Sequence, residues 1–167
     1  MTRLASLFDR LTTALAWASG AGFVLLSLYV TASAVGRYLG VFYTRGNDDL
    51  SALVLAFGST AGLAYALRVG AHVRVDILYA TLPARARDAL TTVSLALMAL
   101  FAGLLAVYAW RLAAESFSIG MRSVSIVRMP VWLPQLLVAL GFTMLAVQAL
   151  ASMAGLLMRQ VADLRRR

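Results

Sequence analysis

The sequence predicts an all-α integral membrane protein with four transmembrane helices. Of its 167 residues, 62% are hydrophobic and 13% are charged, whereas soluble domains are about 45–50% apolar and about a quarter charged. The apolar residues gather in four charge-free runs, each close to the roughly 20 residues that a helix needs to cross a bilayer. Helices are expected because hydrocarbon offers no partner for the open edge of a β-sheet.

The four spans are expected to form a single membrane domain, residues 1–167. They lie near residues 13–36, 50–67, 89–110 and 132–157. The first is too long for the core of a signal peptide and lacks a small-residue cleavage site, so we expect it to stay attached. Pro83 is expected in the first turn of the third helix. Pro130 suits the start of the fourth, and Pro134 should bend its first turns, because proline lacks a backbone donor.

The arginines predict the orientation of the spans. An even number of spans puts both termini and the central loop, residues 68–88, on one side. Of the 15 basic residues, all arginine, ten lie on that side and five on the other. Because basic residues are enriched in cytoplasmic loops, we expect both termini in the cytoplasm.

The composition argues against several classes of function. There is no cysteine, which excludes disulfides and thiolate chemistry. The spans contain no Asp, Glu, His or Arg, which a subunit that moves ions by itself usually carries. His72 is the only histidine, whereas a membrane b-type haem normally needs two axial ligands. With no phosphate loop or HExxH motif, we expect no catalytic, cofactor-binding or metal site and no enzyme activity. The net charge of +8 lies at the edges of the apolar runs, which argues against a nucleic-acid partner.

The central loop contains an unusual stretch, "GAHVRVDIL". In an extended segment His72, Arg74 and Asp76 would share one face, and in a helix His72 and Asp76 could pair across one turn. Either geometry predicts an amphipathic interfacial segment between the second and third helices. Its arginines, with Arg68 just before it, would meet lipid phosphate or a partner's carboxylates. The alternative is a solvated loop with anchoring arginines.

The second span has small residues at every fourth position. Gly58, Gly62 and Ala66 would form a face that lets two helix backbones approach closely. The alternative is that glycine and alanine are simply common in this chain.

Several motifs, in this order, resemble the DctQ-like family, the small membrane subunit of tripartite ATP-independent periplasmic (TRAP) transporters. "VGRY" (35–38) closes the first span, and Asp48 and Asp49 open the second. "FGSTAGLAYALRVGAHVRVDIL" (57–78) is the most specific stretch. "MPVWLPQLLVALGF" (129–142) is similar to the family's Pro-Trp entry into the last span.

The resemblance covers about residues 10–158 and has two departures. Family members commonly have a tryptophan and paired glutamates before the second span, whereas this chain has "TRGNDDL". The shorter aspartates put in doubt any contact that depends on the reach of a glutamate.

The resemblance implies a role in a complex of the bacterial inner membrane. The small subunit would pack as a scaffold against a large sodium-coupled permease subunit, and a periplasmic binding protein would deliver an organic acid. The trio His72, Arg74 and Asp76 would then form a cytoplasmic belt against lipid and the large subunit. Candidate periplasmic contacts are Arg37, Asp48 and Asp49.

Three other classes fit the hydropathy. The small four-helix subunit of a tripartite tricarboxylate transporter would look similar, and only the "GAHVRVDIL" and "VGRY" matches favour the TRAP family. A membrane anchor of a respiratory complex is disfavoured by the lone histidine. A small proton-coupled exporter is disfavoured because the first span has no acidic residue.

Overall fold

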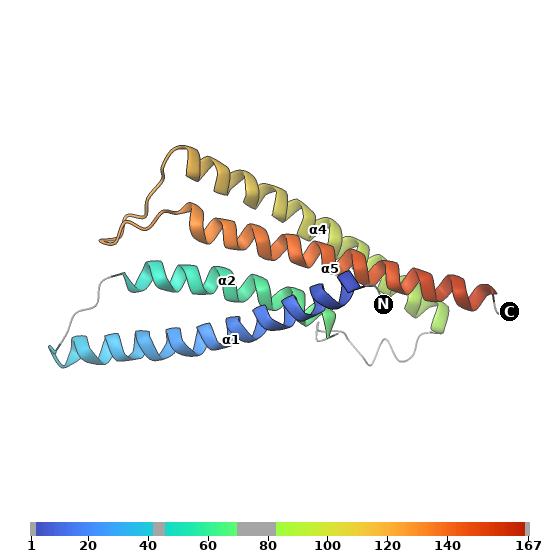
Figure 1. Ribbon diagram of the computed structural model, residues 1–167, viewed down its shortest axis with the longest axis horizontal. Helices are drawn as coiled ribbons and strands as arrows, with labels where there is room; N and C mark the ends of the chain where they lie inside the picture. Colours follow the sequence, from blue (N-terminus) through green and yellow to red (C-terminus); the bar gives the residue numbers. More distant parts are fainter. Residues whose placement is uncertain (1–2, 42–45, 70–82, 166–167) are drawn as a thin grey trace.

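The computed structural model describes residues 3–41, 46–69 and 83–165. Within these ranges the structure has four long helices (Figure 1), which are α1 Arg3–Tyr38, α2 Asn47–Arg68, α4 Ala84–Ser118 and α5 Trp132–Arg165. Each contains a stretch long and apolar enough to cross a membrane. The prediction of an all-helical chain with four apolar spans is therefore confirmed.

The helices extend beyond the charge-free runs. α4 continues through Arg111 and Glu115 to Ser118, two turns past the expected end at residue 110. A charge ends an apolar run without ending a helix, because a long side chain can lie along the helix surface and leave its charged group at the interface. The guanidinium of Arg111 lies over the Tyr108 ring of the preceding turn, 6.0 Å from its centre.

The prolines lie where helices begin. Pro83 immediately precedes α4 rather than standing in its first turn, and its carbonyl accepts the N–H of Arg87 at 3.1 Å. Pro130 lies in the loop before α5. Pro134 is the third residue of α5, where an N–H would have no partner within the helix. Its missing donor therefore costs α5 no hydrogen bond.

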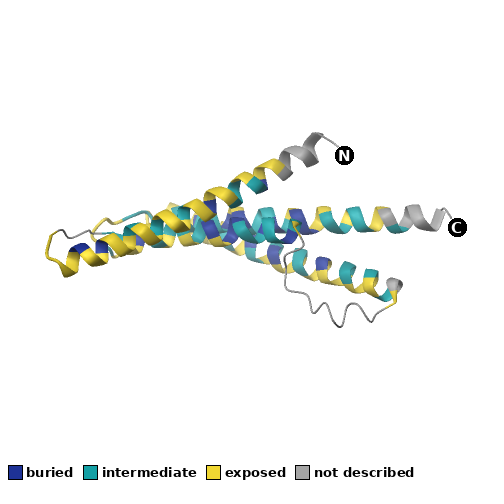
Figure 2. Ribbon diagram, turned by 90° about the horizontal axis from the view of Figure 1, so that it is seen from below, coloured by how far each residue is buried: buried dark blue, intermediate teal, exposed yellow. Residues whose placement is uncertain are grey.

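The four helices form a flat layer in the order α1, α2, α5, α4 (Figure 1). The extensive packing is between α1 and α2, α2 and α5, and α4 and α5. Seen edge-on, the helices run close together in the middle of the layer, while the N-terminal parts of α1 and α4 diverge to opposite sides of α5 (Figure 2). The start of α1 and the end of α5 lie at the same end of the molecule.

The two central helices, α2 and α5, pack closely at Gly141. A Cβ added to Gly141 of α5 would overlap Cβ and Oγ1 of Thr60 on α2 and come within 3.1 Å of the Thr60 backbone. The Thr60 hydroxyl donates at 2.6 Å to the carbonyl of Ala56 in its own helix, so it does not need a partner on α5. Only glycine fits at position 141.

The outer helices attach to the central pair by separate contacts. Phe23 of α1 lies against Gly58 of α2, where a Cβ would be 2.5 Å from the ring. On the other side, Trp110 of α4 donates to the hydroxyl of Thr143 on α5 at 3.1 Å. A small apolar core joins three helices and is formed by Leu67 of α2, Leu95 and Ala102 of α4, and Leu145 and Ala149 of α5.

We predict that Gly141→Ala separates α2 from α5. The added methyl group meets the stem and backbone of Thr60, which cannot rotate away, and such overpacking costs roughly 1–3 kcal/mol. Thermal unfolding of the purified chain in detergent, followed by tryptophan fluorescence, should show a lower midpoint.

The matched control is Gly103→Ala on α4, because no atom lies within 4 Å of its added Cβ. The midpoint of this variant should stay equal or rise, since alanine favours a helix by about 1 kcal/mol over glycine. Equal midpoints for the two variants would contradict the close contact.

Candidate functional site

The loop between α4 and α5, residues 119–131, is an ordered hairpin. The Ser123 N–H donates to the Met129 carbonyl at 2.9 Å, and the Val131 N–H donates to the Met121 carbonyl at 3.1 Å. Arg128 closes the turn with a positive φ of 50°, a conformation that non-glycine residues rarely adopt. The hairpin therefore has a fixed shape of its own.

Asp49 of α2 holds this hairpin. Asp49 lies in the first turn of α2 and is only 8% exposed. Its Oδ2 accepts a short hydrogen bond from the hydroxyl of Ser125. The Ser125 oxygen also accepts the N–H of Arg128 at 3.2 Å. Because Ser125 gives its proton to Asp49, Ser123, 2.8 Å away, is the donor in the contact between the two serines.

An apolar contact reinforces this clamp. Gly46, just before α2, has a φ of 92°, a conformation that glycine adopts without cost. A Cβ at Gly46 would be 2.5 Å from Cγ2 of Val127. Residue 46 must therefore be glycine, both for its positive φ and for the space that Val127 occupies. The hairpin thus contacts the start of α2 through one polar and one apolar contact. We call the contacts of Asp49 with Ser125 and of Gly46 with Val127 the hairpin clamp.

The remaining candidates at this end of the molecule reach the surface. Arg37 lies in the last turn of α1 and Asp48 in the first turn of α2, and both are exposed. Asp49, by contrast, faces the hairpin. The structure thus assigns the two adjacent aspartates to different environments, one solvent-facing and one internal.

The candidates further along α2 also differ from one another. Gly58 is buried against α1, whereas a Cβ at Gly62 would meet nothing within 4 Å. Arg68 donates from Nη1 to the hydroxyl of Thr13 on α1 at 2.6 Å. His72, Arg74 and Asp76 lie outside the described residues.

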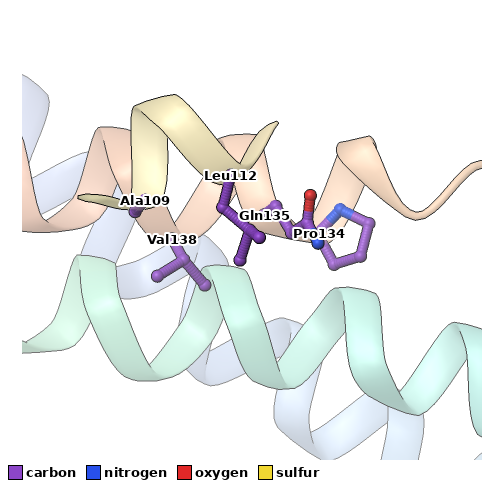
Figure 3. A pocket seen from close by; sticks show the side chains of 5 residues that line it. All are labelled: Ala109, Leu112, Pro134, Gln135 and Val138. Atoms are coloured by element: carbon purple, nitrogen blue, oxygen red, sulfur yellow. The ribbon is translucent and has the colours of Figure 1, made fainter. Parts of the chain in front are cut away.

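A small cavity of about 220 Å³ lies between α4 and α5 (Figure 3). Ala109 and Leu112 of α4 face Pro134, Gln135 and Val138 of α5 across it. Gln135 is the only polar residue of this lining, and its Oε1 is buried and accepts no hydrogen bond from the described residues. One amide in an apolar cavity supplies neither a nucleophile with its base nor a set of metal ligands.

Among residues 3–41, 46–69 and 83–165, no group of three or more His, Cys, Asp or Glu could hold a metal ion. Some polar side chains there bond within their own helix, as Thr60 does to the Ala56 carbonyl, and others link two helices, as Arg68 does with Thr13.

The hairpin residues that contact α2 were not identified from the sequence. Ser123 and Ser125 alternate in "RSVSIVR", which places both hydroxyls on one side of an extended segment. Nothing in the sequence identifies Asp49, 76 positions away, as the acceptor. Gly141 was missed for the same reason. Ser33 is recognisable in the sequence as a polar residue of the first span, but its role as acceptor for Asn47 Nδ2, at 2.7 Å, is not.

The four long apolar helices define the class as a multi-pass membrane protein. The family model of the DctQ component of tripartite ATP-independent periplasmic transporters matches residues 26–159. The chain belongs to this family and is the small permease component of a TRAP transporter. Membership implies a tripartite complex with the other TRAP components. No curated protein matches the chain.

We predict that Ser125→Ala destabilises the protein more than removal of an exposed hydroxyl. The substitution leaves the buried Asp49 carboxylate without its donor, and an unsatisfied buried group costs roughly 1–3 kcal/mol. The unfolding midpoint in detergent should fall, and proteolysis should cut the hairpin faster. Ser118→Ala, at an exposed position, is the control and should change neither readout. Similar behaviour of the two variants would contradict the clamp.

Proposed function

We propose that the chain acts as a stationary scaffold in the bacterial inner membrane. It packs against a larger permease subunit that moves an organic acid with sodium, while a periplasmic binding protein delivers the substrate. The family membership supports the tripartite assembly. The flat layer is the observation that carries the scaffold role.

A flat layer suits a scaffold because it presents two broad faces. Large apolar side chains are exposed along both outer helices, among them Trp17 at 77% and Leu25 at 66% on α1, and Phe101 at 63% on α4. These surfaces must meet lipid or another helix. Small residues in the same spans allow a partner's backbone to approach closely. In lipid, burial of apolar groups gives little gain, so such close packing drives helix association.

The same layer is a poor candidate for a transport path. The described helices carry no Asp, Glu, His, Lys or Arg between Arg10 and Arg37, between Asp49 and Arg68, between Asp88 and Arg111, or in α5 before Arg159. Gln148 is the largest buried polar residue of α5, and it is neutral. Ion coupling by side-chain charge therefore belongs to another subunit.

The orientation follows from the arginines. With both termini in the cytoplasm, the hairpin clamp, Arg37 and Asp48 face the periplasm. Arg37 and Asp48 then stand at the rim where a binding protein docks, and the clamp holds the surface around them in shape. On the cytoplasmic side, Arg68, His72, Arg74 and Asp76 form the belt against lipid and the large subunit. The substrate class is an organic acid such as a dicarboxylate, keto acid, sialic acid or sulfonate.

We expect the chain, purified alone into liposomes, to carry no organic acid along a sodium gradient. Liposomes that contain the chain together with its large permease subunit, supplied with the binding protein, should take up substrate. Uptake is measured with radiolabelled substrate. Substantial sodium-driven uptake by the chain alone would refute the scaffold role.

We expect Asp48→Asn to change how uptake depends on salt. A rim charge mainly tunes the encounter rate of two proteins and is screened by salt. The concentration of binding protein needed for half-maximal uptake should therefore shift at low ionic strength and return to the wild-type value at high ionic strength. Asp88→Asn, at the opposite end of the layer in α4, is the control. An unchanged salt profile for Asp48→Asn would count against docking at this rim.

A further inference from the structure

A long apolar groove runs between α1 and α2 on one face of the layer. Its volume is about 880 Å³, within the roughly 300–1,000 Å³ that is typical of small-molecule sites. Gly58 and Gly62 lie along α2, and the aromatic side chains of Trp17, Phe23 and Tyr65 also line it. Ser19 contributes the one side-chain hydroxyl besides that of Tyr65, and it donates to the Leu15 carbonyl of its own helix at 2.7 Å.

The length of the groove along α1 is close to the thickness of one leaflet. Its lining on α1 runs from Ala16 to Leu25, which corresponds to roughly 14 Å at a rise of about 1.5 Å per residue. The hydrocarbon core of a bilayer is roughly 30 Å thick. A helix that crosses the membrane needs contacts over both leaflets, whereas an acyl chain occupies one. The length of the groove favours a lipid.

The end of the groove nearest the N-terminus is lined by aromatic residues and followed by positive charge. Trp17 and Tyr65 line this end, and tryptophan and tyrosine favour the membrane interface. One turn beyond them, the Arg68 guanidinium bonds to Thr13 at 2.6 Å and so lies between α1 and α2. Arg10 is exposed and precedes Trp17 by seven residues, about two turns, which places both on the same side of α1.

We propose that this groove binds an anionic phospholipid. Its acyl chains lie on Gly58 and Gly62, and its phosphate lies beside Arg68 and Arg10. The apolar lining matches the chains and the two arginines match the charge of the headgroup, each basic residue near an anionic surface contributing about 1 kcal/mol. The proposal rests on residence in the membrane and does not depend on which subunit moves the substrate.

Two glycines make the groove testable without disturbing the fold. A Cβ at Gly20 or at Gly62 meets nothing within 4 Å, so a leucine there occupies the groove rather than a neighbouring helix. Gly103 of α4 has the same open surroundings and lies outside the groove. Gly103→Leu is therefore a control of equal size and equal change in helix propensity.

The experiment is native mass spectrometry of the full-length chain in detergent. The probes are dioleoyl phosphatidylglycerol, which is anionic, and dioleoyl phosphatidylcholine, which has the same acyl chains and no net charge. Wild type and Gly103→Leu should retain one phosphatidylglycerol in preference to phosphatidylcholine. Gly62→Leu should lower its apparent affinity by about tenfold, or ~1.4 kcal/mol.

Arg68→Gln tests the headgroup separately. Its amide can still donate to Thr13, but the charge is gone, so the preference for phosphatidylglycerol should fall by about fivefold, as expected for ~1 kcal/mol per basic residue. Retention of phosphatidylcholine should stay the same.

Three results would overturn the proposal. The first is equal phosphatidylglycerol retention by Gly62→Leu and Gly103→Leu. The second is equal retention of the two lipids by wild type. The third is a Gly62→Leu variant that retains lipid as wild type does but no longer co-purifies with the large permease subunit. This result would identify a helix of that subunit as the occupant of the groove. Failure of the scaffold role in the liposome experiment would leave all three lipid readouts unaffected.

Discussion

The close approach of α5 to α2 at Gly141 and Thr60 sets the geometry of the whole layer. These two helices are central, and each carries one outer helix, α1 on α2 and α4 on α5. The hairpin depends on the same contact, because Asp49 belongs to α2 and Ser125 lies a few residues before α5. A side chain at position 141 would push α5 away from α2. The hairpin would move with α5, and Ser125 would separate from Asp49.

Different forces hold the middle and the ends of the layer. In the middle, where lipid tails compete equally for apolar surfaces, close packing of small residues is the available source of stability. At the ends, side-chain hydrogen bonds fix how neighbouring elements are placed against each other. Near the hairpin, Asn47 donates to Ser33 and Ser125 donates to Asp49. At the opposite end, Arg68 donates to Thr13. The layer is thus packed along its length and fixed at both ends.

This construction suits the proposed scaffold role. A flat layer keeps both of its faces available, which a compact bundle of four helices would not. The hairpin clamp holds the shape of the end that carries Arg37 and Asp48. The apolar groove between α1 and α2 occupies part of one exposed face.

The sequence alone determined the number of spans, the helical class and the family, because each depends on local runs of apolar residues or on motifs in chain order. It identified Asp48, Asp49, Gly58 and Gly62 as notable, but it could not distinguish their roles. Asp49 binds the hairpin and Asp48 faces outward; Gly58 is covered by Phe23 and Gly62 lines an open groove. Only the tertiary structure decided these differences, because each depends on a residue from a distant part of the chain. The flat order α1, α2, α5, α4 was likewise beyond hydropathy, which measures how apolar a helix is but not which neighbour it packs against.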